Sequence, residues 1–237
     1  LAGLGLKPGD HVAICLENHP RFFEVVWGCH YAGIVYTCCS SRLTTEELSY
    51  IINDCGAKAF ITSKYKADQA QEIADEIPGV TLRLMLDGTI PGYDSFESTV
   101  DAAPATELPD MVDGVDMLYS SGTTGLPKPL VHDHGGTMLN GMTHKNLHYD
   151  VACSYEDNAW GERFLWYSST GWVMWNAQLS GLLSGTTCVI YDGNPGGTKD
   201  HPDWGVLWRY AAQERVTFFG AGAAFFTNCM KAGVQLS

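Results

Sequence analysis

The fold is decided by residues 11–63, which read HVAICLENHPRFFEVVWGCHYAGIVYTCCSSRLTTEELSYIINDCGAKAFITS. Apolar, β-branched runs predict strands at 11–18, 34–40 and 58–63, and segments of helical periodicity predict helices at 20–33 and 43–56. The second helix opens with a capping box, Thr44 to Glu47, and stops at Gly56. Strands that alternate with helices predict an α/β protein with layered, mainly parallel sheets flanked by helices.

The same alternation continues along the rest of the chain. Further strands are expected at 80–86, 130–132, 163–169, 186–193 and 216–222, and further helices at 66–77, 135–151, 171–185, 204–215 and 223–233. Residues 87–113 are irregular, with three prolines and scattered acids, and make the best internal boundary. We therefore expect two β/α subdomains, residues 1–110 and residues 111–237.

Composition excludes several classes of partner. The 237 residues carry a formal charge of −13 with only 14 lysines and arginines, which disfavours nucleic acid and acidic membrane surfaces as partners. No apolar run approaches the roughly 18 residues of a membrane span. Eight cysteines lie mostly in apolar runs without a C-x-x-C pattern, which indicates buried thiols of a cytoplasmic protein: Cys15, Cys29, Cys38, Cys39, Cys55, Cys153, Cys188 and Cys229.

A second stretch, YSSGTTGLPK at residues 119–128, carries the chemistry. Its glycines let backbone N–H groups converge, its hydroxyls add donors, and Lys128 supplies positive charge for a polyphosphate. It is neither the Walker pattern nor G-x-G-x-x-G, so a hydride-transferring dinucleotide enzyme is disfavoured. On pattern alone, a solvent-exposed Ser/Thr/Gly turn remains an alternative.

Residues 119–136, YSSGTTGLPKPLVHDHGG, closely resemble the phosphate-binding motif of the AMP-forming acyl-CoA synthetases, a branch of the adenylate-forming family. Many members have glycine after the lysine, whereas this chain has Pro129, which lacks an N–H and stiffens the exit. Residues 5–36 resemble the fatty-acyl branch, and residues 166–196 resemble acetoacetyl-CoA and acetyl-CoA synthetases. The resemblance thus changes from one branch of the family to another along the chain. Both a mosaic chain and a member of an intermediate subgroup would show such a change.

The resemblance implies part of the large N-terminal domain of an adenylate-forming enzyme and a two-step ligation. A small-molecule carboxylate attacks Mg·ATP to give acyl-AMP and pyrophosphate, and coenzyme A then forms the thioester; ATP, Mg²⁺ and coenzyme A are the implied cosubstrates. The implied phosphate ligands are Ser120, Ser121, Gly122, Thr123, Thr124, Gly125 and Lys128. Lys128 and Thr123 would act in catalysis by neutralising and positioning charge, and no residue of the loop is expected to be a general base.

The stretch TGWVMWN supplies a second candidate site. In acetyl-CoA synthetases the matching stretch lines the acyl pocket, so Trp172, Val173 and Met174 would bind a short or medium-chain acid. Alternatively, Trp172 and Trp175 are core anchors of a buried helix. Gly196 is a candidate for the coenzyme A path and is equally an ordinary turn residue.

Histidines suggest a metal site only weakly. His132 and His134 would share one side of a strand and His144 and His148 one helix face, but nothing in the sequence brings the pairs together. Surface or core histidines explain all four, and we expect no resident metal site.

The chain opens on LAGLGLKPGD without methionine and stops at KAGVQLS, so we expect the central part of a longer protein. The adenine- and ribose-binding segments and the C-terminal domain with the catalytic lysine are not found. We expect the isolated chain to be inactive without these family segments. The alternative is a catalytically silent α/β module that binds phosphate or nucleotide weakly.

Overall fold

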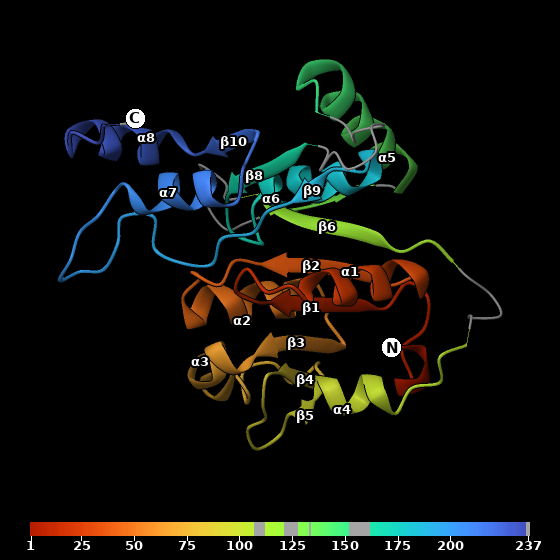
Figure 1. Ribbon diagram of the computed structural model, residues 1–237. Coiled ribbons are helices and arrows are strands. Elements are labelled where there is room, and N and C mark those ends of the chain that lie inside the picture. Colours follow the sequence, from red (N-terminus) through yellow and green to blue (C-terminus); the bar gives the residue numbers. More distant parts are fainter. Residues whose placement is uncertain (107–111, 121–127, 133, 152–161, 236–237) are drawn as a thin grey trace. The chain divides into compact units, whose positions relative to one another are not determined.

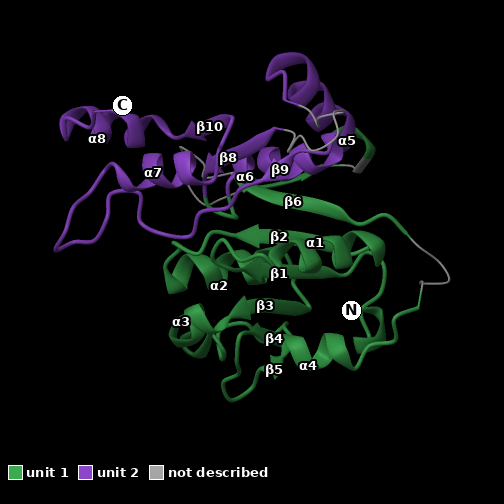
Figure 2. Cartoon of the chain, in the orientation of Figure 1, with its two compact units in different colours: residues 1–136, 169–171 green, residues 137–168, 172–237 purple. Residues whose placement is uncertain are grey.

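The computed structural model describes residues 1–106, 112–120, 128–132, 134–151 and 162–235. These residues form two compact units, which Figure 2 colours separately. Unit 1 comprises Leu1–Gly136 with Ser169–Gly171, and unit 2 comprises Thr137–Ser168 with Trp172–Ser237. Each unit has its own sheet and its own apolar core.

Unit 1 is built on a seven-stranded sheet with the strand order β5-β4-β3-β1-β2-β6-β7. Its strands are β1 (His11–Cys15), β2 (Val35–Cys39), β3 (Ala59–Ser63), β4 (Leu82–Leu86), β5 (Asp94–Ser95), β6 (Val115–Ser120) and β7 (Lys128–His132). Every neighbouring pair is parallel except β6 with β7. The carboxyl ends of β1 to β6 therefore lie along one edge of the sheet, which is where ligands bind in open α/β sheets.

Helices flank this sheet (Figure 1). They are α1 (Phe22–Tyr31), α2 (Thr45–Asp54), α3 (Ala67–Glu72) and α4 (Phe96–Asp101), with short 3₁₀ turns at Ala2–Leu4 and Lys64–Lys66. The predicted capping box of α2 is confirmed: Thr44 accepts from the Glu47 N–H, and the Glu47 carboxylate accepts from the Thr44 N–H. Gly56 adopts the positive φ of 64° that ends this helix, a conformation that glycine allows without strain.

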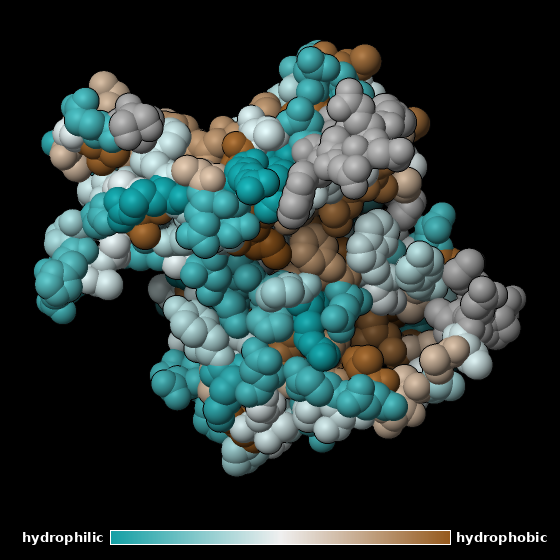
Figure 3. Space-filling view, in the orientation of Figure 1, coloured by the Kyte–Doolittle hydropathy of each residue, from teal (hydrophilic) through white to brown (hydrophobic). Residues whose placement is uncertain are grey.

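The core of unit 1 explains why these segments form these elements. All five residues of β3 are buried, as expected for a parallel strand covered on both faces. Helix α2 buries Leu48, Ile51 and Ile52, spaced i, i+3 and i+4, against this sheet. The face of unit 1 visible in Figure 3 is mainly hydrophilic to neutral, with small apolar patches, because most large apolar side chains are inside.

Unit 2 contains a three-stranded parallel sheet in the order β10-β8-β9. Its strands are β8 (Arg163–Tyr167), β9 (Thr187–Cys188) and β10 (Phe218–Ala221). Its helices are most of α5 (His134–Thr143), a π-helix η3 (His144–His148), α6 (Val173–Leu179), a 3₁₀ turn η4 (Ser180–Ser184), α7 (Val206–Gln213) and α8 (Ala223–Lys231). Helices α7 and α8 each bury residues spaced i to i+4, namely Leu207 with Ala211 and Phe225 with Cys229.

Three expectations of local structure were wrong. The stretch 87–113 was expected to be irregular, yet it contains β5 and α4, whose N-cap Ser95 accepts from the Ser98 N–H. The strand expected at 186–193 is only the two residues Thr187–Cys188. His134 begins α5 and does not continue β7, so the backbone does not keep it on a strand with His132.

The expected boundary between two subdomains, at residues 110 and 111, stays a prediction. Within the described residues, the sheet of unit 1 continues past this point into β6 and β7. Within the part of the chain that the structure describes, none of the helices combines the length and the apolar character that a membrane span needs.

The described cysteines are free thiols, and all but the partly exposed Cys188 are buried. Burial raises the pKa of Cys15 and of Cys29 to about 12, which makes both thiols weak nucleophiles. Cys153 lies outside the described residues. The expectation of buried, unpaired thiols is confirmed for the remaining cysteines except Cys188.

Candidate functional site

The ends of the predicted phosphate segment are fixed by strand pairing. Strand β6 ends at Ser120, β7 begins at Lys128, and these two residues lie directly opposite one another in the antiparallel register. Paired residues of such strands have Cα atoms about 4.5–5.5 Å apart. Residues 121–127, which include Ser121, Gly122, Thr123, Thr124 and Gly125, lie outside the described residues. The two residues that flank this segment, Ser120 and Lys128, are paired at one end of the β6–β7 ladder.

A side-chain hydrogen bond holds the end of β6 in this position. The Tyr119 hydroxyl donates to the Asp54 carboxylate over 2.7 Å, and burial together with this carboxylate raises the pKa of Tyr119. Pro129, which follows Lys128, lies opposite Tyr119 in β7. Strand β7 is the last strand of the sheet, the place where a proline without an N–H is tolerated. The Lys128 side chain is exposed to solvent.

Residues Ser169–Gly171 belong to unit 1 and dock against the same edge of its sheet. The Thr170 hydroxyl is buried and donates to the Leu16 carbonyl over 3.0 Å, with the Cys39 carbonyl at 3.4 Å. A Cβ on Gly171 would lie 2.4 Å from the Ser40 nitrogen, so only glycine fits this approach. The sequence predicts a helix from Gly171 onward, but Thr170 and Gly171 instead anchor this segment to the ends of β1 and β2.

In unit 2, helix α6 presents the predicted acyl-site residues at its N-terminus. Trp172 is the N-cap and is 51% exposed, Val173 is 55% exposed, and Met174 is half-buried. Trp175, in contrast, is 1% exposed. The alternative in which both tryptophans are core anchors is therefore wrong for Trp172 and right for Trp175. Trp172 and Val173 are exposed, and the acyl-binding role of residues 172–174 stays a prediction.

Two buried contacts of Gln178 position α6 on the sheet of unit 2. Its side-chain carbonyl accepts from the Trp166 N–H over 2.6 Å, and its amide donates to the Val189 carbonyl over 2.9 Å. The Trp166 ring lies over Gly220 of β10, where a Cβ would come within 2.2 Å of the ring. These contacts fix the carboxyl end of β8, which the segment leading to α6 follows.

Gly196 lies in a turn against an aromatic ring. Its N–H donates to the Asn194 side chain over 2.9 Å, and a Cβ would come 2.9 Å from the Trp204 ring. This packing accounts for glycine at position 196 as an ordinary turn residue. The role of Gly196 toward coenzyme A stays a prediction.

Among the described histidines, His144 and His148 lie together, with ring centroids 5.3 Å apart. They occupy the π-helix of unit 2, whereas His132 belongs to β7 of unit 1. Within the described residues, a group with metal-ligand potential occurs at Glu17, His19 and Asp87, which the sequence analysis did not select.

Comparisons with known proteins agree with this architecture. The family model described as "AMP-binding enzyme" matches residues 1–236. The chain belongs to this family of AMP-binding enzymes. The family predicted from the phosphate motif is thereby confirmed.

Individual relatives show which enzymes of this family the chain resembles. The chain is 29% identical over 255 residues to the acetoacetyl-coenzyme A synthetase of Rhizobium meliloti (strain 1021), an alignment that covers 98% of this chain and 37% of that protein. It is 25% identical over 254 residues to the acetyl-coenzyme A synthetase of Syntrophobacter fumaroxidans (strain DSM 10017 / MPOB), with coverage of 98% and 37%. The chain thus spans about 37% of the length of these relatives.

A solved structure confirms the fold. The acetoacetyl-CoA synthetase from Streptomyces lividans superimposes with a TM-score of 0.84 and 33% sequence identity, covering 99% of this chain and 37% of that one. The predicted fold, a mostly parallel sheet flanked by helices in the N-terminal domain of an adenylate-forming enzyme, is confirmed.

Proposed function

We propose that the chain is part of an AMP-forming acid:CoA ligase that activates a short or medium-chain carboxylate. The proposed reaction joins the carboxylate to the α-phosphate of ATP, releases pyrophosphate, and then transfers the acyl group to the thiol of coenzyme A. The membership in the AMP-binding enzymes and the names of the relatives support this reaction class.

The observation that carries the proposal is the pairing of Ser120 with Lys128 at the end of β6. The two residues that flank the seven-residue segment 121–127 are thus neighbours across the strand pair. Its sequence, SGTTGLP, offers three hydroxyl groups and two glycines. Hydroxyls and converging backbone N–H groups are the donors that phosphate oxygens require. Their position after a strand of a parallel sheet supports a ligand site.

In the proposed mechanism, the obstacle is the approach of one anion to another. Lys128 would place its ammonium group near the departing pyrophosphate, and Thr123 would donate a hydrogen bond to the same group. Ser120, Ser121, Gly122, Thr124 and Gly125 would complete the binding of the phosphates. These groups neutralise and position charge, and none of them removes a proton. Mg²⁺ enters this scheme with ATP, as its phosphate-bound partner.

The acyl part of the proposal rests on Trp172, Val173 and Met174. Two of the three side chains are more than half exposed, which leaves them available to contact a substrate. Bulky side chains around a substrate favour a short acyl chain, because each extra methylene must find room. The proposal also includes coenzyme A binding near Gly196, where the turn packs against the Trp204 ring. A cytoplasmic location belongs to the same proposal, supported by the free thiols.

Carboxylate-dependent exchange of labelled pyrophosphate into ATP tests the proposed function. The whole protein that contains this chain should catalyse exchange with acetate, acetoacetate or a medium-chain acid. Lys128→Ala should lower the exchange rate by about 10²–10³, the usual cost of removing one preorganised transition-state contact. Lys199→Ala, an exposed lysine outside the proposed site, is the matched control.

The alternative is a catalytically silent α/β module that binds phosphate or nucleotide weakly. It predicts no exchange with any carboxylate from the whole protein. Equal exchange by Lys128→Ala and Lys199→Ala would leave the ligase class possible but would remove the role proposed for Lys128.

A further inference from the structure

Three neighbouring strands of unit 1 deliver polar side chains to one edge of the sheet. Glu17 and His19 follow β1, Ser63 is the last residue of β3, and Asp87 follows β4. The strands lie in the order β4-β3-β1 and are parallel. Residues that are 68 positions apart in sequence are therefore brought together, and the loops after β1 and β4 meet at Glu17, His19 and Asp87.

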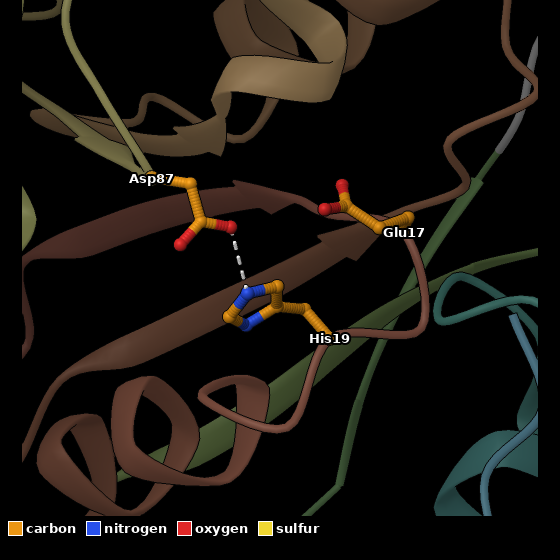
Figure 4. A group of neighbouring side chains, drawn as sticks. All are labelled: Glu17, His19 and Asp87. Atoms are coloured by element: carbon orange, nitrogen blue, oxygen red, sulfur yellow. Dashed lines mark hydrogen bonds and ion pairs between the residues drawn. The ribbon is translucent and has the colours of Figure 1, made fainter.

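The three side chains offer one nitrogen and two carboxylate ligands within a small space. His19 Nε2 lies 3.0 Å from Asp87 Oδ2, and the possible ligand atoms of all three residues lie within 4.8 Å of one another. Figure 4 shows the carboxylates of Glu17 and Asp87 on the same side of the His19 ring. The His19 side chain is 16% exposed and that of Asp87 59%, so an ion from solvent can reach the group.

Outer contacts orient each of the three residues. The Ser63 hydroxyl donates to Glu17 Oε2 over 2.5 Å, and the Arg21 N–H donates to His19 Nδ1 over 3.1 Å. The backbone N–H of Asp87 donates to the Glu97 carboxylate over 3.1 Å. In metal sites, an outer partner such as Ser63 holds its ligand in place and contributes to affinity.

We propose that Glu17, His19 and Asp87 form a binding site for a divalent transition metal of the Zn²⁺ type, which joins the loops after β1 and β4. One imidazole nitrogen and two carboxylate oxygens are ligands that Zn²⁺ accepts, with water as a fourth. Ligand atoms around Zn²⁺ lie about 3–3.5 Å apart, as follows from bonds of about 2.0–2.2 Å. The His19 to Asp87 distance already has nearly this value, and Glu17 needs only a side-chain adjustment.

Metal binding moves the proton of the neutral His19 ring from one ring nitrogen to the other. Because Nδ1 accepts from the Arg21 N–H, the neutral ring carries its proton on Nε2 and donates it to Asp87. The metal takes the Nε2 lone pair, so the proton moves through solvent to Nδ1 and the hydrogen bond from Arg21 is given up. The ring remains neutral and no net proton is lost from it. This exchange limits the affinity and gives the site a spectroscopic signature.

The proposed metal site is separate from the end of β6, where Ser120 pairs with Lys128. Strand β3, at the centre of the group, is three strands away from β6 along the sheet. Neighbouring strands are about 4.8 Å apart, so β3 and β6 are about 14 Å apart. Its occupancy can therefore be measured without any ligase activity.

Zn²⁺ titration of the whole protein, followed by competition with a chromophoric chelator, tests the proposal. Asp87→Asn is the decisive variant, because Asp87 has a φ of 60° and asparagine tolerates this left-handed conformation as well as aspartate does. His19→Gln removes the nitrogen ligand. The matched control is His148→Gln, which removes one ring of the exposed His144–His148 pair, the strongest rival for Zn²⁺ among the described residues.

We expect one Zn²⁺ per chain to be bound and its affinity to fall on the order of 100-fold or more in Asp87→Asn and in His19→Gln, since loss of outer partners alone costs about 10–100-fold. His148→Gln should leave this affinity unchanged. The ¹⁵N signals of the His19 ring should change from the Nε2–H to the Nδ1–H tautomer when Zn²⁺ binds.

The proposal is overturned if Asp87→Asn binds Zn²⁺ as the unmodified protein does while His148→Gln loses it. It is equally overturned if the His19 ring keeps its proton on Nε2 at saturating Zn²⁺, because the group would then be a hydrogen-bonded His–Asp pair only. Circular dichroism and the melting temperature of each metal-free variant establish that lost binding is not lost folding.

Discussion

Thr170 in unit 1 and Lys145 in unit 2 are both buried polar side chains, but their surroundings differ. The Thr170 hydroxyl donates to carbonyls at the ends of β1 and β2. The Lys145 nitrogen has no hydrogen-bond partner among the described residues and lies 3.1 Å from the centroid of the Phe164 ring. The first contact ties a segment to the sheet, whereas the second leaves an amine to be stabilised by aromatic rings.

The pKa of Lys145 records this difference. Burial lowers it to about 8, and the nearby Cys188 opposes the shift. The amine sits in the π-helix η3, next to the Tyr149 ring. A buried hydroxyl with partners thus contributes to stability, and a buried ammonium without them costs stability. Four substitutions probe this comparison.

The largest effect is expected from Lys145→Met, which should raise the free energy of unfolding by about 2 kcal/mol at pH 7. Methionine keeps much of the chain length and removes the charge that burial penalises. The cost in the original protein is fully present below pH 8. It is relieved as pH rises from about 8 toward 10.5, because only the unfolded state then keeps the proton.

Urea unfolding of both proteins between pH 7 and pH 10 measures this effect. The difference between them should shrink as pH rises, and taking the difference cancels the titration of the cysteines and tyrosines. Lys199→Met, at an exposed lysine, is the control and should show no pH-dependent difference. A constant difference across this pH range would mean that Lys145 is not the group that titrates.

Thr170→Val should lower the free energy of unfolding by about 1–2 kcal/mol. Valine has nearly the same shape but cannot donate, so the buried carbonyls of Leu16 and Cys39 lose a hydroxyl partner. Thr81→Val is the control, because the Thr81 hydroxyl is exposed and lies 3.3 Å from the Lys58 carbonyl. Equal denaturation midpoints for the two variants would show that the anchor at Thr170 adds no stability.

Tyr119→Phe should lower the free energy of unfolding by about 1 kcal/mol. It removes the hydrogen bond to Asp54 that holds the end of β6, and solvent at this site reduces the effect. Tyr65→Phe, at a tyrosine that is 74% exposed, should change nothing. Thermal melts suffice for this test, and a Tyr65 variant that melts as early as the Tyr119 variant would contradict it.

Trp172→Ala should have the smallest effect on stability, within about 0.5 kcal/mol, because its ring is half exposed. The same variant should favour longer acids by about 10-fold or more in pyrophosphate exchange, since the proposed acyl site gains room. Trp27→Ala, at an exposed tryptophan of unit 1, is the control for both readouts. An unchanged preference among acids would remove Trp172 from the proposed substrate site.

The sequence predicted the order of strands and helices well where burial is continuous. Strand β3 is buried along its whole length and α2 carries both a capping box and an apolar stripe, so local signals agree with the fold. Helix α4 was missed because only Phe96 is buried in it. Strand β9 was predicted too long, since apolar residues after Cys188 continue without strand pairing.

Side-chain groups were less predictable, because they depend on strand order. Asp87 meets His19 only because β4 joins the far side of β3, and no local pattern specifies this order. Helical spacing places Trp172 and Trp175 on one face, yet α6 begins only at Val173, which leaves Trp172 outside the helix and exposed. The phosphate segment, in contrast, was predicted from its own residues.

Crystals of the whole protein soaked with ATP and Mg²⁺ would show whether the segment between β6 and β7 holds the triphosphate. We expect triphosphate density bounded by Ser120 at the end of β6 and by the Lys128 side chain at the start of β7, with backbone N–H groups of residues 121–127 turned toward it. Triphosphate bound elsewhere, with residues 121–127 turned toward solvent, would refute the phosphate role proposed for this segment.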